Sequence, residues 1–252
     1  MSLFFKLLVL FLLFFSNSVR CLAAAINERF PLAHSRQALL VLTDAWESNR
    51  GEAQLFERHE LEDLWKSKGA KMVVNVGERG LGWGSGLHGL PGEREPVKQE
   101  GDKRSPAGIF KLSSAFGYAA DGGSFLNLPY IPIDAMTECV DDIDSRHYNL
   151  IVKKETVSVV DWNSSERMLR KDDLYKWGAV VEHNPVPRLK KGGSCIFLHI
   201  WERPSAPTSG CTSFSEGDLL ALLKLLRSAA NPVLIQLPQL EYLRLREVWK
   251  LP

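Results

Sequence analysis

The sequence predicts a mainly β, sandwich-like domain with a few helices, two of them near the C-terminus. Short segments rich in β-branched, aromatic or leucine residues recur along the chain. Glycine, proline, asparagine or aspartate separates most of these segments, as expected for β-strands joined by turns. Segments with apolar residues at helical spacing appear only after residue 215.

The predicted strands are all short and follow one another with few long gaps. They cover residues 39–43, 54–58, 72–76, 148–153, 157–161, 179–182, 195–201 and 233–237. Residues 77–92 hold seven glycines and a proline, so this stretch is expected to form turns. It lacks the strand–loop–helix setting of a phosphate-binding motif.

Two helices are predicted near the end of the chain. Ser215 followed by Asp218 resembles a capping box. The first helix then carries an apolar stripe at core-packing spacing, made of Leu219, Leu222, Leu223 and Leu226, and it stops at residues 231–232. The second covers about residues 239–250, and its Leu240, Leu243 and Trp249 are expected to pack into the core.

The first 25 residues have the composition of a secretory signal peptide. Lys6 precedes an apolar run, residues 7–15, and three alanines end the segment at residues 23–25. An uncleaved membrane anchor is the alternative, but the run is shorter than the roughly 20 apolar residues that span a bilayer. We therefore expect an exported protein with one mature domain, residues 26–252, in the periplasm or cell-wall space.

The charge of the mature chain argues against nucleic-acid binding. The whole chain carries 31 basic and 30 acidic residues, for a formal charge of +1. Cleavage after residue 25 would remove Lys6 and Arg20 and no acid, which gives a formal charge of −1. Proteins that neutralise phosphates need a basic surface, which this composition does not supply overall.

Three cysteines remain in the mature chain: Cys139, Cys195 and Cys211. An odd number leaves at least one free thiol in a monomer outside the cytoplasm. Cys139 and Cys195 could form a disulfide or remain buried thiols, and the sequence leaves both open.

The segment from residue 194 to residue 215 could carry thiol chemistry. Strand alternation places Cys195, Phe197, His199 and Trp201 on one face, and a proline-containing loop returns to Cys211. An imidazole beside a thiol can accept its proton and activate it as a nucleophile. The amides around Ser209, Gly210 and Cys211 could stabilise a developing oxyanion.

Two other interpretations of these residues stay open. A cysteine is often a small buried apolar residue, and a strand histidine often packs in the core. Zinc is a further option, with Cys195, His199, Cys211 and His183 as candidate ligands. Their spacing, however, matches no C-x-x-C or H-x-x-x-H pattern, so no metal is expected.

Two motifs resemble those of the L,D-transpeptidase catalytic-domain (YkuD-type) family. His199, a loop and residues 208–211, T-S-G-C, are similar to the family's histidine followed by S/T-H-G-C. Residues 101–110, G-D-K-R-S-P-A-G-I-F, are similar to its G-D-x-x-T-P-x-G-x-F turn, which composition alone reads as a loop entering a strand. The resemblance covers about residues 39–251, and the chain looks like an exported bacterial branch of the family.

The resemblance implies a YkuD-like sandwich in which Cys211 is the nucleophile and His199 the general base. Thr208 would help to orient the histidine, often through its backbone carbonyl. The implied reaction attacks a peptidoglycan stem tetrapeptide, releases D-alanine and passes the acyl group to an amine, with no cofactor. Substrate contacts are expected from His183, Asn184, Trp201 and Arg203, in a protein that is expected to be monomeric.

The sequence also departs from the family's pattern. Ser209 stands where the family has a second histidine, and the loop before Thr208 is shorter than usual. Two alternatives therefore remain: an L,D-carboxypeptidase or hydrolase that uses the same nucleophile, and a wall-binding module without turnover.

Overall fold

The computed structural model describes residues 31–91, 94–120 and 125–252, so the expected signal peptide lies outside the described residues. Its helices are α2 (Glu216–Leu225) and α3 (Gln239–Trp249), with 3-10 turns η1 (Lys154–Thr156) and η2 (Ser228–Ala230). Its strands are β1 (Gln37–Thr43), β2 (Arg50–Glu57), β3 (Lys66–Asn75), β4 (Leu81–Trp83), β5 (Ser105–Gly117), β6 (Tyr130–Pro132), β7 (Thr137–Val140), β8 (Ile151–Lys153), β9 (Ser165–Arg167), β10 (Trp177–Val181), β11 (Phe197–Ile200), β12 (Thr212–Phe214) and β13 (Val233–Pro238).

One large sheet dominates the fold, in the order β10-β11-β12-β3-β2-β1-β13-β5-β4. An additional pairing of β10 with β5 closes this path on itself, and β6 extends it from β5. The result is the mainly β, sandwich-like arrangement that the sequence predicts, and this prediction is confirmed.

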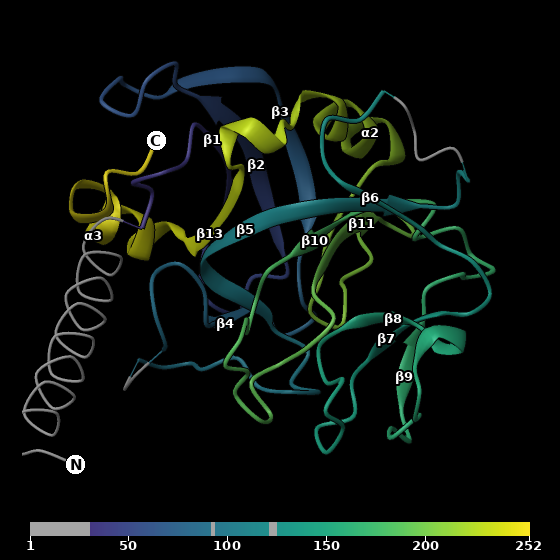
Figure 1. Ribbon diagram of the computed structural model, residues 1–252. Helices are drawn as coiled ribbons and strands as arrows, with labels where there is room; N and C mark the ends of the chain where they lie inside the picture. The colour runs from purple at the N-terminus through teal and green to yellow at the C-terminus, as the bar shows by residue number, and fades with distance from the viewer. Residues whose placement is uncertain (1–30, 92–93, 121–124) are drawn as a thin grey trace, which may run out of the picture.

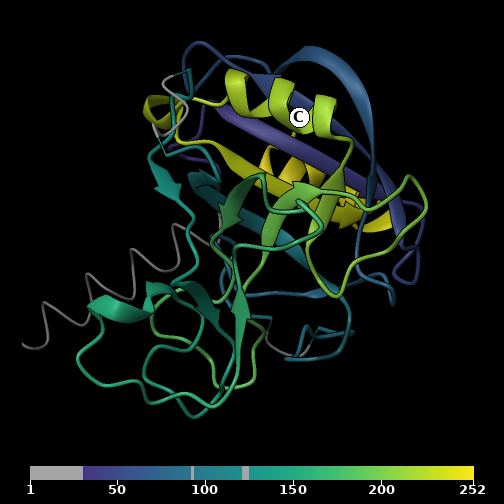
Figure 2. The ribbon, with the colours of Figure 1, turned by 90° about the vertical axis from the view of Figure 1, so that its right-hand side faces the viewer.

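A smaller sheet, β8-β7-β9, lies beside the large one (Figures 1 and 2). Between the two sheets is a second hydrophobic cluster, separate from the main core. Its buried members are Phe116, Ile133, Cys139, Met168, Tyr175, Cys195, Phe197 and Cys211. The predicted nucleophile therefore lies where the small sheet packs on β5, β10 and β11.

Both C-terminal helices begin where the sequence predicts them, but α2 ends at Leu225 and not at residues 231–232. The Ser215 hydroxyl accepts a hydrogen bond from Asp218 N, at 3.1 Å, and caps α2. The predicted core face of α3 is confirmed for Trp249, which is buried, but it is wrong for Leu240 and Leu243, which are 77% and 57% exposed because Tyr242 occupies the core-facing side with Trp249. In the part of the chain that the structure describes, no helix is long and apolar enough to cross a bilayer.

One predicted strand is missing from the structure. Residues 157–161 form no strand, and Val159 and Val160 are largely exposed because no neighbouring strand pairs with them. Elsewhere the structure contains more strand than the sequence predicts: β6, β7, β9 and β12 lie outside every predicted segment. The glycine-rich loop contains β4, and β5 continues to Gly117, because β10, β13, β4 and β6 all hydrogen bond to it.

The glycine of the 101–110 motif makes room for a buried histidine. Gly108 has a φ of +134°, and a Cβ there would come within 2.0 Å of the His88 ring. That ring accepts a hydrogen bond from Ile109 N through Nδ1, at 3.1 Å, and its Nε2 donates to Gly84 O, at 3.0 Å. Burial lowers the pKa of His88 to about 4, so the ring is neutral at physiological pH.

Replacing Gly108 with alanine is expected to destabilise the fold by roughly 3 kcal/mol, from the strained φ and the clash with His88. Gly217→Ala is the matched control, because a Cβ there meets nothing within 4 Å and the residue lies in α2. That variant should be stabilised by about 0.5 to 1 kcal/mol. Urea unfolding measures both, and equal stability of the two variants would contradict the proposed crowding.

Candidate active site

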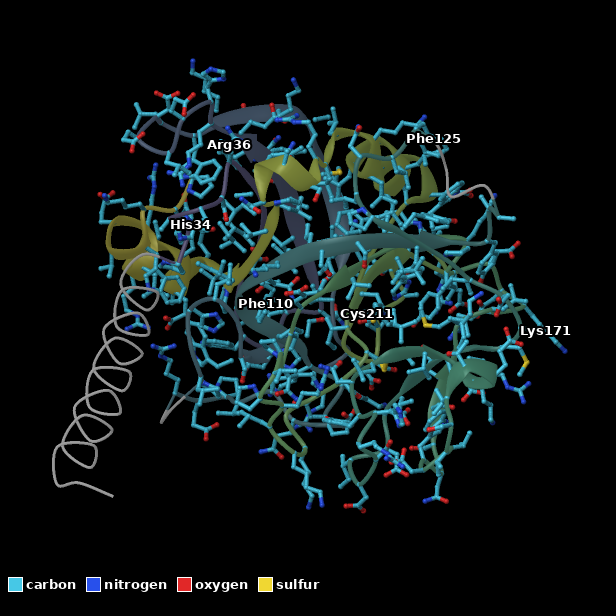
Figure 3. All side chains as sticks on the ribbon, in the orientation of Figure 1. His34, Arg36, Phe110, Phe125, Lys171 and Cys211 are labelled. Carbon is cyan, nitrogen blue, oxygen red and sulfur yellow. A yellow bond between two sulfur atoms is a disulfide. The ribbon has the colours of Figure 1, made fainter. Side chains whose placement is uncertain are left out.

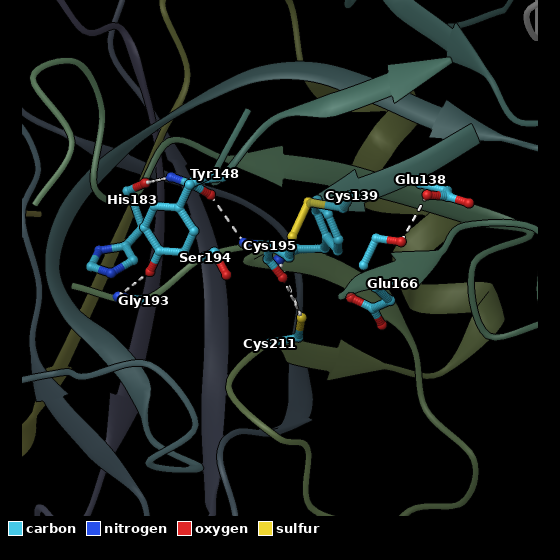
Figure 4. Close-up of a disulfide and its surroundings, with 12 residues drawn as sticks. Glu138, Cys139, Tyr148, Glu166, His183, Gly193, Ser194, Cys195 and Cys211 are labelled. Atoms are coloured by element: carbon cyan, nitrogen blue, oxygen red, sulfur yellow. Dashed lines mark hydrogen bonds between the residues drawn. A yellow bond between two sulfur atoms is a disulfide. The ribbon is translucent and has the colours of Figure 1, made fainter. Parts of the chain in front are cut away.

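The three cysteines of the expected mature chain divide into a pair and a single thiol. Cys139, in β7, forms a disulfide with Cys195, just before β11 (Figure 4). Among the described residues, Cys211 is the free cysteine, and it is 9% exposed. The disulfide excludes Cys195 as a zinc ligand, and no group of three potential ligands is found in the described ranges.

Strand alternation places His199 on the same face as Phe197, as the sequence predicts. Both side chains contact the Tyr175 ring, with centroids 5.3 Å from His199 and 5.6 Å from Phe197. Strand β12 runs parallel to β11, with Ser213 opposite His199. Cys211 immediately precedes β12 and receives a hydrogen bond from Phe197 N to its Sγ, at 3.3 Å. The thiol and the imidazole therefore lie diagonally on one face of adjacent strands.

Both groups also line one cleft of about 570 Å³. The Cys211 thiol donates to Cys195 O, at 3.5 Å, and no hydrogen bond joins it to His199 in the described part of the chain. His199 Nδ1 donates to Ile200 O, at 2.7 Å, which leaves Nε2 as the basic nitrogen. Figure 3 shows Cys211 in the interior, between the two sheets.

The two groups are neutral in the resting site. Burial lowers the pKa of His199 to about 4 and raises the pKa of the Cys211 thiol to about 12, and the nearby Glu166 carboxylate adds to the latter rise. At neutral pH the pair is therefore imidazole and thiol, and no preformed ion pair exists. A nucleophilic attack by this thiol would therefore require removal of its proton during the attack.

The backbone of Cys211 is held by two hydroxyl groups. Ser105 Oγ donates to Cys211 O, at 2.8 Å, and accepts from Gly77 N. Thr208 Oγ1 donates to the same carbonyl, at 2.6 Å, and accepts from Gly210 N, at 3.1 Å. The G-D-x-x-T-P-like turn is thus tied directly to the cysteine, and Ser105 is a site residue to which the sequence analysis assigned no role.

Loss of either hydroxyl should loosen the cysteine. Ser105→Ala leaves the buried Gly77 amide without its acceptor, which costs about 1–3 kcal/mol. Thr208→Val keeps the shape, and we expect a smaller loss of stability. Both variants should slow alkylation of Cys211 by iodoacetamide, roughly 10-fold each, with less than additive effects in the double variant. Unchanged labelling rates would show that the hydrogen bonds from Ser105 and Thr208 to Cys211 O have no part in the reactivity of the thiol.

The structure also changes the predicted roles of the 208–211 loop. The Thr208 carbonyl accepts from Glu78 N, so Ile200, and not Thr208, orients the histidine. Gly210 N is already bonded to Thr208, which leaves the amides of Ser209 and Cys211 as candidate oxyanion donors. Gly210 has a φ of +153°, and a Cβ there would lie 3.2 Å from Arg104 O.

Only one of the four predicted substrate contacts lines the cleft. Trp201 does, but Arg203 is exposed and pairs with Glu202 at 2.9 Å. His183 is buried beyond Tyr148 (Figure 4), where it bonds Gly192 O at 2.8 Å. The Asn184 side-chain amide folds the 189–193 turn through Leu189 and Gly193. The structure therefore places His183 and Asn184 within the fold and Arg203 on its surface, outside the lining of the cleft, and their contact with substrate stays a prediction.

Several cleft residues come from segments with no sequence motif. Glu166, in β9, and Tyr175, in the loop before β10, share a hydrogen bond beside Cys211. Lys98 also lines the cleft, buried and paired with Asp102 at 2.7 Å. Asp102 belongs to the 101–110 motif and also accepts from Arg104 N, so this carboxylate shapes the turn that carries Ser105.

Compared with known proteins, the chain matches no family model and no curated protein.

Proposed function

We propose that the chain is an exported cysteine acyltransferase, an L,D-transpeptidase that acts on peptidoglycan stem tetrapeptides. Cys211 is the nucleophile and His199 the general base. One observation carries the proposal: the free thiol of the described chain lies in a cleft, on the face that bears a neutral imidazole, with its backbone fixed by Ser105 and Thr208. Nucleophilic catalysis needs these parts together.

In the proposed first step, His199 Nε2 accepts the thiol proton as sulfur attacks the carbonyl carbon of the substrate's peptide bond. The C–N bond then breaks, the departing D-alanine amine takes a proton from the imidazolium, and a thioester remains on Cys211. An amine of a second stem attacks this thioester and gives its proton to His199. The thiolate that leaves is protonated again, so the cycle needs no cofactor.

The surroundings of the thiol fit a substrate that carries charges of both signs. Lys98 and Arg170 line the cleft together with Glu100 and Glu166. Stem peptides present both carboxylates and amines. The Cys139–Cys195 disulfide supports export as well, because such bonds persist in oxidising compartments.

Incubation with disaccharide-tetrapeptides tests the proposal. Mass spectrometry should detect an acyl adduct on the intact protein, free D-alanine and cross-linked dimers. Shortened stems without dimers would instead identify a hydrolase with the same nucleophile. A folded protein that binds cell wall, but gives no adduct, dimer or shortened stem, would contradict the proposal and favour a binding module.

A further inference from the structure

A tyrosine and a glutamate lie against the proposed nucleophile. Tyr175 is 3% exposed, and its hydroxyl donates a hydrogen bond to Glu166 Oε1. Tyr175 and Cys211 belong to the same buried cluster, and both line the cleft. The Tyr175 ring packs edge-on against Phe116 and Phe197, with its centroid 5.7 Å from that of Phe116 and 5.6 Å from that of Phe197.

Other charged groups surround this pair. The Arg170 guanidinium lies 5.1 Å from the centre of the Tyr175 ring and 3.6 Å from Glu166 Oε1. It also pairs with Asp172, at 2.6 Å. Further titratable groups also line this cleft: Lys98, Glu100, Asp141, His199 and Glu202. The Glu166 side chain keeps 29% of its surface exposed, so it lies at the cleft wall.

We propose that Tyr175 is a catalytic residue whose hydroxyl has two hydrogen-bond positions, on Glu166 while Cys211 is a thiol and on the sulfur once the thiolate forms. Glu166 is its positioning residue. This inference rests on the proposed role of Cys211 as nucleophile. No proton leaves Tyr175 in the change: the thiol proton goes to His199, and the tyrosine O–H changes its acceptor.

The Tyr175 hydroxyl must change between these two acceptors because a phenol carries a single proton. A hydroxyl can donate to one acceptor well, so a strong bond to the Glu166 carboxylate withholds it from the sulfur. The Glu166 charge and burial also keep the pKa of the Cys211 thiol high, whereas a hydrogen bond from Tyr175 lowers it. The pair therefore keeps the resting thiol protonated and stabilises the thiolate when it is expelled from the thioester.

The pH dependence of Cys211 alkylation by iodoacetamide in the intact chain tests this without any cell-wall substrate. Glu166→Gln removes the negative charge beside the thiol and weakens the hydrogen bond that Tyr175 donates to residue 166. The pH midpoint of Cys211 alkylation should therefore fall by about one unit, with roughly 10-fold faster labelling at pH 8. Tyr175→Phe should raise the midpoint. Glu166→Gln should give a smaller acceleration in the Tyr175→Phe background, because only the loss of the charge then acts on the thiol. Peptide mapping assigns the label to Cys211.

Glu216→Gln is the matched control, because it removes an exposed carboxylate that pairs with Lys176, next to Tyr175. It should leave the midpoint unchanged. If Tyr175→Phe does not fold, Glu166→Ala serves instead: loss of charge alone predicts equal shifts for Ala and Gln, whereas release of Tyr175 predicts a larger shift for Ala. An unmoved midpoint in Glu166→Gln, or equal acceleration with and without Tyr175, would overturn the inference. Absence of an acyl adduct alongside the expected shifts would reject only the proposed function.

Discussion

Cys211→Ala is expected to abolish acyl-enzyme formation while leaving the fold intact. The thioester needs the sulfur atom, and no other free thiol lies in the described chain to replace it. Loss of a nucleophile typically costs more than about 10⁴-fold in acyl transfer. Intact-mass measurement with a tetrapeptide donor or a carbapenem should show no adduct on this variant, and an adduct that survives would place the nucleophile elsewhere.

His199→Gln should be damaging for a different reason. The thiol remains, but it loses the neutral base on its own face of the sheet, and general-base catalysis contributes about 10² to 10⁴-fold. Because the pKa of Cys211 is governed by burial and Glu166, alkylation by iodoacetamide should change little in this variant. A variant that loses acyl transfer but keeps alkylation would assign His199 to proton transfer, whereas equal loss of both would point to a disturbed fold.

Local patterns were enough for the strands and helices that carry their own signal. The capping residues Ser215 and Asp218 located α2, and alternation correctly grouped Phe197 with His199. The length of β5 could not be predicted in this way, because Pro106, Gly108 and three serines lower its strand propensity. Its partners on both sides determine where it ends.

The site was only partly predictable for a related reason. Cys211 and His199 are close in sequence, so a strand and a returning loop were sufficient to relate them. Glu166 and Tyr175 come from segments with no motif, and only the packing of the small sheet brings them to the sulfur. The same ambiguity misled the prediction for Asn184, since an amide that folds a turn and an amide that binds substrate look alike in sequence.

The Cys139–Cys195 disulfide should contribute several kcal/mol to the free energy of unfolding. It closes a loop between residues 56 apart in sequence. In the chain-entropy treatment, such a loop corresponds to roughly 4 kcal/mol at 25 °C. It also fastens β7, and with it β9 and Glu166, to the segment that leads into β11. We therefore expect the Cys139→Ala/Cys195→Ala double variant to be less stable and to react faster at the Cys211 thiol.

Two measurements separate these losses. Urea unfolding should show a free energy of unfolding lower by about 2–5 kcal/mol in the double variant. At urea concentrations where both proteins remain folded, Cys211 alkylation should be faster than in the parent chain, because the small sheet no longer holds Glu166 and Tyr175 against the sulfur. A double variant that unfolds at the parent's urea concentration would show that packing between the sheets, and not the covalent link, keeps the cleft assembled.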